Sequence, residues 1–206
     1  MENKLVYIVG DKGNMANRYK AVLDYIGVRY TGHDKDEPYF FPQDATHFII
    51  CTPTVRHCDD IDKCLEFNKP ILCEKPISKD LNQLLEFEKK WGQKTRLVSM
   101  VNQYRYMVPP TMVGETRYDY FKSGADGLFW DCINIIGLAS DSFVVSNRSP
   151  VWTCTINGKE LRLNYVDKSY IVMLRSWLSG RFNNWDYAVA AHKKVHAILE
   201  KQCPTS

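Results

Sequence analysis

The chain has 206 residues, enough for one large domain or for one full domain with a smaller second one. Its formal net charge is +3, a quarter of its residues are charged, and no lysine or arginine run stands out, so we expect no nucleic-acid partner and no membrane partner. The apolar run that begins at Leu5 is too short for a signal peptide or a membrane span, which predicts a cytoplasmic protein. The seven cysteines form no CxxC pair, so neither a disulfide framework nor a metal site is expected.

The first predicted elements are a strand over residues 5–9, a glycine-containing turn and a helix that ends before Gly27. Backbone N–H groups in such a turn, at the positive end of the helix dipole, bind a pyrophosphate in dinucleotide-binding proteins. The residues of this candidate cofactor-binding turn are Gly10, Lys12, Gly13, Asn14 and Met15. An ordinary turn before a helix is the alternative, and the turn by itself does not decide between the two.

A second strand is predicted over residues 28–31, followed by the charged residues Asp34, Lys35 and Asp36. A carboxylate at this strand end accepts hydrogen bonds from the adenosine ribose of NAD, whereas a nearby cation suits the additional phosphate of NADP. Asp34 follows Gly10 at close to the expected spacing of about 20 residues. Acidic and basic residues stand together here, so the choice between NAD and NADP stays open.

Two short, continuous apolar runs at residues 48–51 and 71–73 predict a pair of buried parallel strands with a helix between them. The ends of such strands meet at one edge of the sheet, which is where doubly wound sheets bind ligands. In the intervening helix we expect Thr54 to act as the N-cap and Asp60 to face water. His57 falls in the first helical turn, either near the ligand edge or as a core histidine bonded to a carbonyl group.

This stretch resembles the glucose-fructose oxidoreductase, inositol dehydrogenase and MocA-like (Gfo/Idh/MocA) family of NAD(P)-dependent oxidoreductases. The resemblance rests on the order and spacing of Thr52-Pro53, His57, the Asn68-Lys69 turn and Glu74-Lys75-Pro76. It implies an α/β fold, with an N-terminal Rossmann domain, a doubly wound parallel sheet, over residues 1–102. It also implies that Thr52, Pro53, His57 and Glu74 bind the nicotinamide half of the cofactor.

The resemblance further implies a reduced α+β substrate or oligomerisation domain with antiparallel strands over residues 103–206. Asn157-Gly158 between two β-rich runs predicts a hairpin there. The family's second domain is usually about twice this size, and its open sheet usually supplies oligomer contacts. A homodimer is therefore one expectation.

Two groups of residues are candidates for the chemistry of hydride transfer, which needs a group that takes or gives the hydroxyl proton. In the family, the lysine of the Glu-Lys-Pro motif binds the reacting hydroxyl, which corresponds to Lys75 here. The family's acid/base histidine lies in a helix of pattern D-x-G-x-H-x-x-D, and the aligned residues here are Asp131 and Asn134. An amide has no proton to exchange near neutral pH, so Lys75 itself or a tyrosine would carry the proton. The tyrosines considered are Tyr104, Tyr106, Tyr118 and Tyr120.

The predicted function is NAD(P)-dependent oxidation or reduction of a hydroxyl or carbonyl group in a small polyhydroxy substrate, of sugar or nucleotide-sugar type. The alternative is a catalytically degenerate dinucleotide-binding scaffold with a regulatory or protein-interaction role. The loss of the family's histidine at Asn134 favours the scaffold, and the retained Lys75 favours the enzyme.

Overall fold

A computed structural model of the chain describes residues 3–34, 41–106, 116–119, 133–138, 143–146, 153–156, 159–160 and 166–202. The chain forms two compact units. Unit 1 consists of Met1–Val101 together with Met173–Trp185, and unit 2 consists of Asn102–Val172 and Asp186–Ser206. Unit 1 thus includes a late segment that lies beyond the domain boundary predicted at residue 102.

Unit 1 is built on a five-stranded sheet in which every strand pair is parallel. The strand order is β2-β1-β3-β4-β5. β1 has the bounds predicted for the first strand, residues 5–9. The order reverses between β1 and β3, and doubly wound sheets bind ligands beside the carboxyl ends of the two strands at such a reversal. The strand bounds are β1 (Leu5–Val9), β2 (Arg29–His33), β3 (His47–Ile50), β4 (Ile71–Cys73) and β5 (Val98–Met100).

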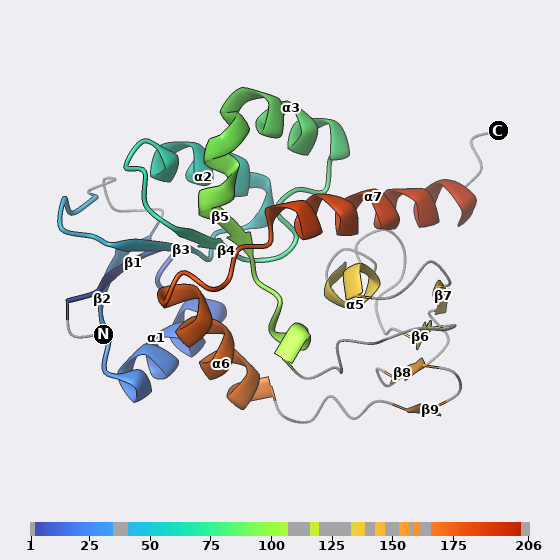
Figure 1. The fold of residues 1–206 in the computed structure, drawn as a ribbon, viewed down its shortest axis with the longest axis horizontal. Coiled ribbons are helices and arrows are strands. Elements are labelled where there is room, and N and C mark those ends of the chain that lie inside the picture. The colour runs from blue at the N-terminus through green and yellow to red at the C-terminus, as the bar shows by residue number, and fades with distance from the viewer. Residues whose placement is uncertain are drawn as a thin grey trace. The chain divides into compact units, whose positions relative to one another are not determined.

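Helices cover both faces of this sheet (Figure 1). On one face lie α2 (His57–Leu65) and α3 (Leu81–Trp91), and on the other lie α1 (Asn14–Ile26) and the C-terminal part of α6 (Val166–Leu178). With both faces covered, β3 and β4 are buried along their whole lengths, as their continuous apolar sequences predict. The doubly wound parallel sheet predicted from the sequence is confirmed.

Short 3₁₀ helices precede or follow several of these elements: η1 (Thr54–Arg56), η2 (Gly92–Leu97) and η3 (Gln103–Tyr106). The prediction that Thr54 caps α2 is wrong, because η1 delays the start of α2 to His57 and Thr54 lies buried inside the 3₁₀ turn. The N-cap position of α2 is occupied by Arg56, whose side chain makes no capping hydrogen bond.

Unit 2 contains a four-stranded sheet in the order β7-β6-β8-β9. The hairpin prediction is confirmed, because β8 and β9 are antiparallel with Ile156 opposite Lys159; Asn157 and Gly158 themselves lie outside the described residues. One pair differs from the antiparallel expectation: β6 and β7 are parallel. The chain between them passes through a helix, the kind of crossover that parallel pairing requires. The bounds are β6 (Thr116–Asp119), α5 (Ile133–Leu138), β7 (Phe143–Ser146), β8 (Thr153–Ile156), β9 (Lys159–Glu160) and α7 (Trp185–Gln202).

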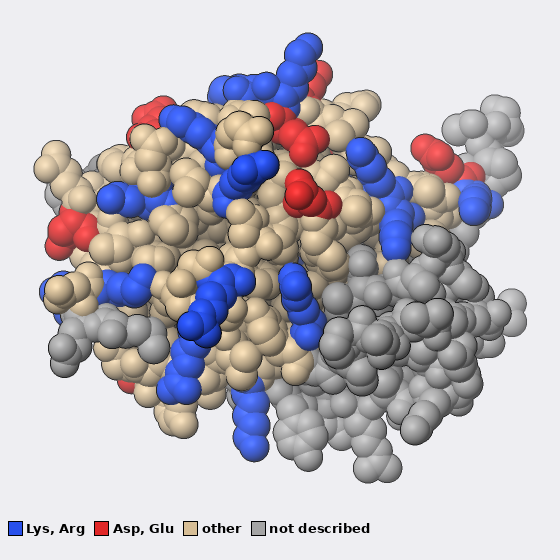
Figure 2. Space-filling view, in the orientation of Figure 1, with Lys and Arg blue, Asp and Glu red and all other residues tan. Residues whose placement is uncertain are grey.

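Charged side chains on the face shown in Figure 2 are spread over the surface, with neutral surface between most of the lysine and arginine side chains. Among the described residues of this face, no single continuous basic patch stands out. None of the helices described is both long enough and apolar enough to cross a bilayer.

Candidate functional site

The glycine turn after β1 is shaped by close contact with the ends of β2 and β3. The N–H groups of Gly10 and Asp11 both donate to the carbonyl oxygen of His33, at 2.9 and 3.2 Å. Gly10 has a φ of +80°, and a Cβ atom there would lie 2.9 Å from the backbone nitrogen of Thr52. Position 10 therefore requires glycine both for its backbone conformation and for the close approach of two strand ends.

Gly13 is the N-cap of α1, and its conformation leaves the helix start open. Its backbone is extended, and as a glycine it has no side chain to cap the first turn of α1. A Cβ atom at Gly13 would meet only the carbonyl oxygen of Gly10, at 3.7 Å. The first N–H groups of α1 consequently receive no cap from this residue, and such a helix start attracts an anionic group. Lys12 and Asn14, on either side, are exposed, and Met15 is half-buried.

Lys20 on α1 forms hydrogen bonds to the glycine turn, and this contact was not predicted from the sequence. Its ammonium group donates to the carbonyl oxygen of Asp11 at 2.7 Å and to the Asp11 carboxylate at 3.1 Å. These two bonds restrict the turn from the helix side. A lysine nine residues beyond its partner gives no local sequence signal, so only the folded chain shows the pair.

The end of β2 carries the residues expected near an adenosine ribose. His33 is buried and stacks on Tyr7, with ring centroids 5.5 Å apart. Asp34 follows it directly and is partly exposed, whereas Lys35 and Asp36 lie outside the described residues. Within the described residues, the charged group at this strand end is thus a carboxylate.

His57 is almost fully buried, at 1% exposure, and links the ends of β3 and β4. Its Nδ1 lies 2.7 Å from the carbonyl oxygen of Pro76, and its Nε2 lies 2.7 Å from that of Thr52. Burial lowers the pKa of His57, while the two carbonyl groups and the carboxylates of Glu74 and Asp60 act in the opposite direction. In this structure His57 holds backbone at the edge of the sheet.

Asp60 belongs to the same network, and the prediction that it faces water is wrong. It has 0% exposure, accepts a hydrogen bond of 2.6 Å from the Thr52 hydroxyl and pairs with Arg56 at 3.3 Å. Because Thr52 and Arg56 supply donors, the buried carboxylate is compensated. Pro53 next to Thr52 is exposed at the same edge.

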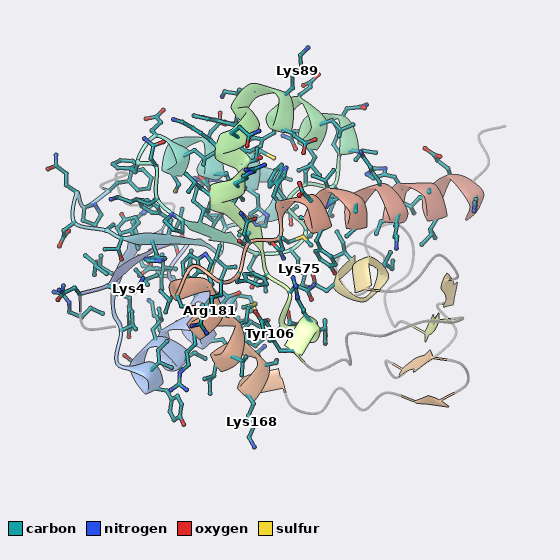
Figure 3. All side chains as sticks on the ribbon, in the orientation of Figure 1. Lys4, Lys75, Lys89, Tyr106, Lys168 and Arg181 are labelled. Atoms are coloured by element: carbon teal, nitrogen blue, oxygen red, sulfur yellow. The ribbon has the colours of Figure 1, made fainter. Side chains whose placement is uncertain are left out.

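Glu74 and Lys75 follow the end of β4. Glu74 is buried, at 6% exposure, and accepts a hydrogen bond of 2.6 Å from the hydroxyl of Tyr19 on α1. Its second carboxylate oxygen accepts one of 3.2 Å from the backbone N–H of Lys75. Lys75, labelled in Figure 3, is half-buried. It precedes Pro76 through a cis peptide bond. Glu74 lies at the edge predicted from the sequence, whereas its partner Tyr19 was not predicted.

The remaining predicted site residues lie in unit 2. Asn134 in α5 is 1% exposed, and its amide donates to the Gln103 side chain at 3.4 Å. The carbonyl oxygen of Asn134 accepts a hydrogen bond of 2.6 Å from the hydroxyl of Tyr187, whose pKa is raised by burial. The side-chain oxygen of Asn134 has no hydrogen-bond partner among the described residues. Tyr106 is half-buried, and Asp131 lies outside the described residues.

Two other kinds of chemistry find no support in the described residues. Burial raises the pKa of Cys51, Cys58, Cys64 and Cys73, for Cys58 to about 12, which keeps the thiols protonated. Protonated thiols are poor nucleophiles. No group of three potential metal ligands occurs among the residues that the structure describes.

Comparison with known proteins gives structural matches only. No protein-family model matches the sequence, and no curated protein matches it. The fold is similar to that of a myo-inositol dehydrogenase from Corynebacterium glutamicum, with 14% identity, 96% of each chain covered and a TM-score of 0.73. It is similar to a Gfo/Idh/MocA family oxidoreductase from Vibrio cholerae, with 10% identity, 98% of each chain covered and a TM-score of 0.73.

A third similar structure is the WlbA (WbpB) dehydrogenase from Thermus thermophilus in complex with NAD and UDP-GlcNAcA. It has 14% identity to this chain and a TM-score of 0.68, and the match covers 95% of this chain and 94% of that one. The TM-scores establish a shared fold, and identities this low support no more than that. The resemblance seen in the sequence is therefore confirmed at the level of the fold. The chain has the Rossmann-like α/β fold of these dehydrogenases.

Proposed function

We propose that this chain is an NAD-dependent oxidoreductase of the Gfo/Idh/MocA type, acting on a hydroxyl or carbonyl group of a small polyhydroxy compound. The observation that carries the proposal is the glycine N-cap of α1, which follows β1 where the strand order reverses between β1 and β3. A dinucleotide fits the residues present, because its pyrophosphate needs room at Gly13, where a Cβ atom would meet only the Gly10 carbonyl oxygen, and the N–H groups of the first helical turn.

The other cofactor contacts are proposed from the same edge. Asp34 would accept the hydroxyl groups of the adenosine ribose, which favours NAD over NADP. Thr52, Pro53, His57 and Glu74 would shape the edge near the nicotinamide, with His57 acting through the backbone that it holds. Two structural neighbours support this choice: WlbA and GenD2 from gentamicin A biosynthesis were each solved in complex with NAD.

In the reaction, bound NAD supplies the hydride acceptor. Lys75 would hold the substrate hydroxyl by a hydrogen bond and receive its proton as the carbon is oxidised. Lys75 is half-buried at the end of β4, directly after Glu74. Asn134, Asp131 and Tyr106 stay candidates from the family resemblance, and the buried amide of Asn134 has no proton to exchange near neutral pH.

The substrate class is proposed from the neighbours. Their names describe a myo-inositol dehydrogenase, a dehydrogenase solved with UDP-GlcNAcA and a UDP-N-acetylglucosamine 3-dehydrogenase. We therefore favour a sugar, cyclitol or nucleotide-sugar. The rival is a non-catalytic dinucleotide-binding scaffold, which Asn134 favours. A shortened second domain would also favour the scaffold, but the matches cover 93–98% of the solved chains.

The test compares Lys75→Met with Lys79→Met, an exposed lysine four residues away as the matched control. NADH and NADPH binding are measured by calorimetry, and NAD reduction is followed with myo-inositol and UDP-N-acetylglucosamine as substrates. We expect Lys75→Met to bind NADH normally and to lose turnover by a factor of about 100 or more. Normal turnover of Lys75→Met with intact NADH binding would remove Lys75 from the mechanism. Asp34→Ala should weaken NADH binding without affecting folding.

A further inference from the structure

Lys75 lies between two residues that are each held by a buried side chain. On its N-terminal side, Glu74 is bonded to Tyr19 of α1; on its C-terminal side, Pro76 is bonded to His57 of α2. Tyr19 is 0% exposed and His57 is 1% exposed. The two helices lie on opposite faces of the sheet (Figure 1), so the segment is held from both faces.

The hydroxyl of Tyr19 donates to Glu74 from the buried face of α1. The other buried residues of α1 are Ala16, Val22 and Leu23. A buried carboxylate is costly unless both of its oxygens find donors. The Tyr19 hydroxyl and the backbone N–H of Lys75 each donate to one of them, at 2.6 and 3.2 Å. The hydrogen bond from Tyr19 thus orients the Glu74 carboxylate, which accepts the hydrogen bond from the Lys75 backbone N–H.

His57 supplies the second connection. Its two ring nitrogens each lie 2.7 Å from a carbonyl oxygen, one of Pro76 and one of Thr52. Thr52 is itself fixed by its 2.6 Å bond to the buried Asp60. A neutral imidazole donates one of these two hydrogen bonds and contacts the other carbonyl group, so the ring fills the space between the residue after Lys75 and the end of β3.

We propose that Tyr19 and His57 are positioning residues that fix the backbone on both sides of Lys75. The inference rests on the proposed function, in which the Lys75 amine must meet a reacting hydroxyl. A lysine side chain has several rotatable bonds, so its amine is placed accurately only when the backbone that carries it is fixed. Small displacements of a reacting group cost large factors in rate, up to about 100-fold for 1 Å. Tyr19 and His57 restrict that displacement without touching the substrate.

The variants are Tyr19→Phe, which removes one hydroxyl, and His57→Gln, which keeps one donor and loses the second contact. The control is Tyr30→Phe, because Tyr30 also donates to a carboxylate, that of Asp24, at an exposed position. Amide hydrogen exchange is measured on the full chain without added cofactor. We expect the Lys75 amide to exchange about tenfold faster in both variants, whereas Ile49 in β3 and the control variant stay unchanged.

A second readout is the rate of Lys75 acetylation by acetic anhydride at one fixed pH, followed by mass spectrometry. In Tyr19→Phe the Glu74 carboxylate that accepts from the Lys75 backbone loses its other donor. We expect the acetylation rate at Lys75 to change by about twofold or more, while that of Lys79 in the same sample does not change.

Unchanged exchange and acetylation at Lys75 in Tyr19→Phe, or exchange that rises equally at Ile49, would overturn the positioning role. Neither measurement needs NADH. A wild-type chain that fails to bind NADH would therefore contradict the proposed function separately from the result at Lys75.

Discussion

Thr52 and Asp60 form a hydrogen bond at the edge where β3 ends, and each depends on the other. The Asp60 carboxylate is fully buried, and the Thr52 hydroxyl donates to it at 2.6 Å. A buried acceptor that loses its donor costs about 1–3 kcal/mol. We predict that Thr52→Val, of nearly the same shape, lowers the free energy of unfolding by that amount in urea titrations. Asp59→Asn on the exposed face of α2 should change it by less than about 0.5 kcal/mol, and equal effects would contradict the role of the bond.

His47 makes the stability of unit 1 depend on pH. Burial and the charges of Lys4 and Lys69 lower its pKa from 6.5 to about 4. The imidazole lies 4.9 Å from the Trp177 ring, and the Lys4 ammonium lies 3.5 Å from its Nε2. The folded state therefore favours the neutral imidazole of His47 over the protonated one.

The sign of the effect follows from proton binding. Between pH 6.5 and 4 the unfolded chain protonates His47 and the folded chain does not, so stability falls as the pH falls through this window. Above pH 6.5 both states are neutral and the stability is fully present. We predict that His47→Gln reduces this pH dependence in urea titrations at several pH values. An unchanged dependence would show that another group is responsible.

At the scale of elements, β2 packs against β1 at a distance that excludes any side chain at Gly32. A Cβ atom there would lie 2.5 Å from the carbonyl oxygen of Ile8 and 2.7 Å from the Cβ of Asp11. We predict that Gly32→Ala lowers the free energy of unfolding by about 2 kcal/mol or more. The matched control is Gly13→Ala, where the nearest atom is 3.7 Å away. Similar thermal midpoints for the two variants would contradict the packing argument.

The elements of unit 1 could be read from the sequence because its buried strands are continuous apolar runs. β1 has the predicted bounds, and β3 and β4 differ by at most one residue at an end. The interactions of Asp60, Tyr19 and Lys20 could not be read in this way. Their partners lie on other elements or outside the local helical pattern, and a periodic pattern predicts only which face of a helix is buried. Asp60 is the clearest case, because its charge predicted an exposed side chain, whereas the hydrogen bond from Thr52 stabilises it in a buried position.

At the scale of the whole chain, unit 1 is completed by residues from far along the sequence. The Asn184 side chain accepts a hydrogen bond from the backbone N–H of Met100 and donates one to its carbonyl oxygen, both at 2.8 Å. Met100 lies in the edge strand β5, where backbone groups lack a further strand as a partner. The family resemblance implies that the late helices pack back toward the first domain, but nothing local to residues 173–185 indicates the partners that Asn184 finds in β5.

We predict that Asn184→Ala leaves two buried backbone groups of Met100 without partners and lowers the free energy of unfolding by about 2–4 kcal/mol. Asn82→Ala, at an exposed position of α3, serves as the control. Unfolding is followed by the intrinsic fluorescence of the chain during urea titration. If the two alanine variants were equally stable, Asn184 would not be a structural partner of β5.

The central claim is that the open start of α1 binds the pyrophosphate of NAD, and calorimetric titration of the cofactor-free chain with NADH tests it most directly. The comparison is between the wild type and Gly13→Ala, whose added methyl group fits the protein but occupies the space proposed for the phosphates. We predict micromolar binding to the wild type and an affinity at least about tenfold lower, or about 1.4 kcal/mol, for a Gly13→Ala chain with unchanged thermal stability. Absence of NADH binding to the wild type, or equal affinity of the two chains, would contradict the account.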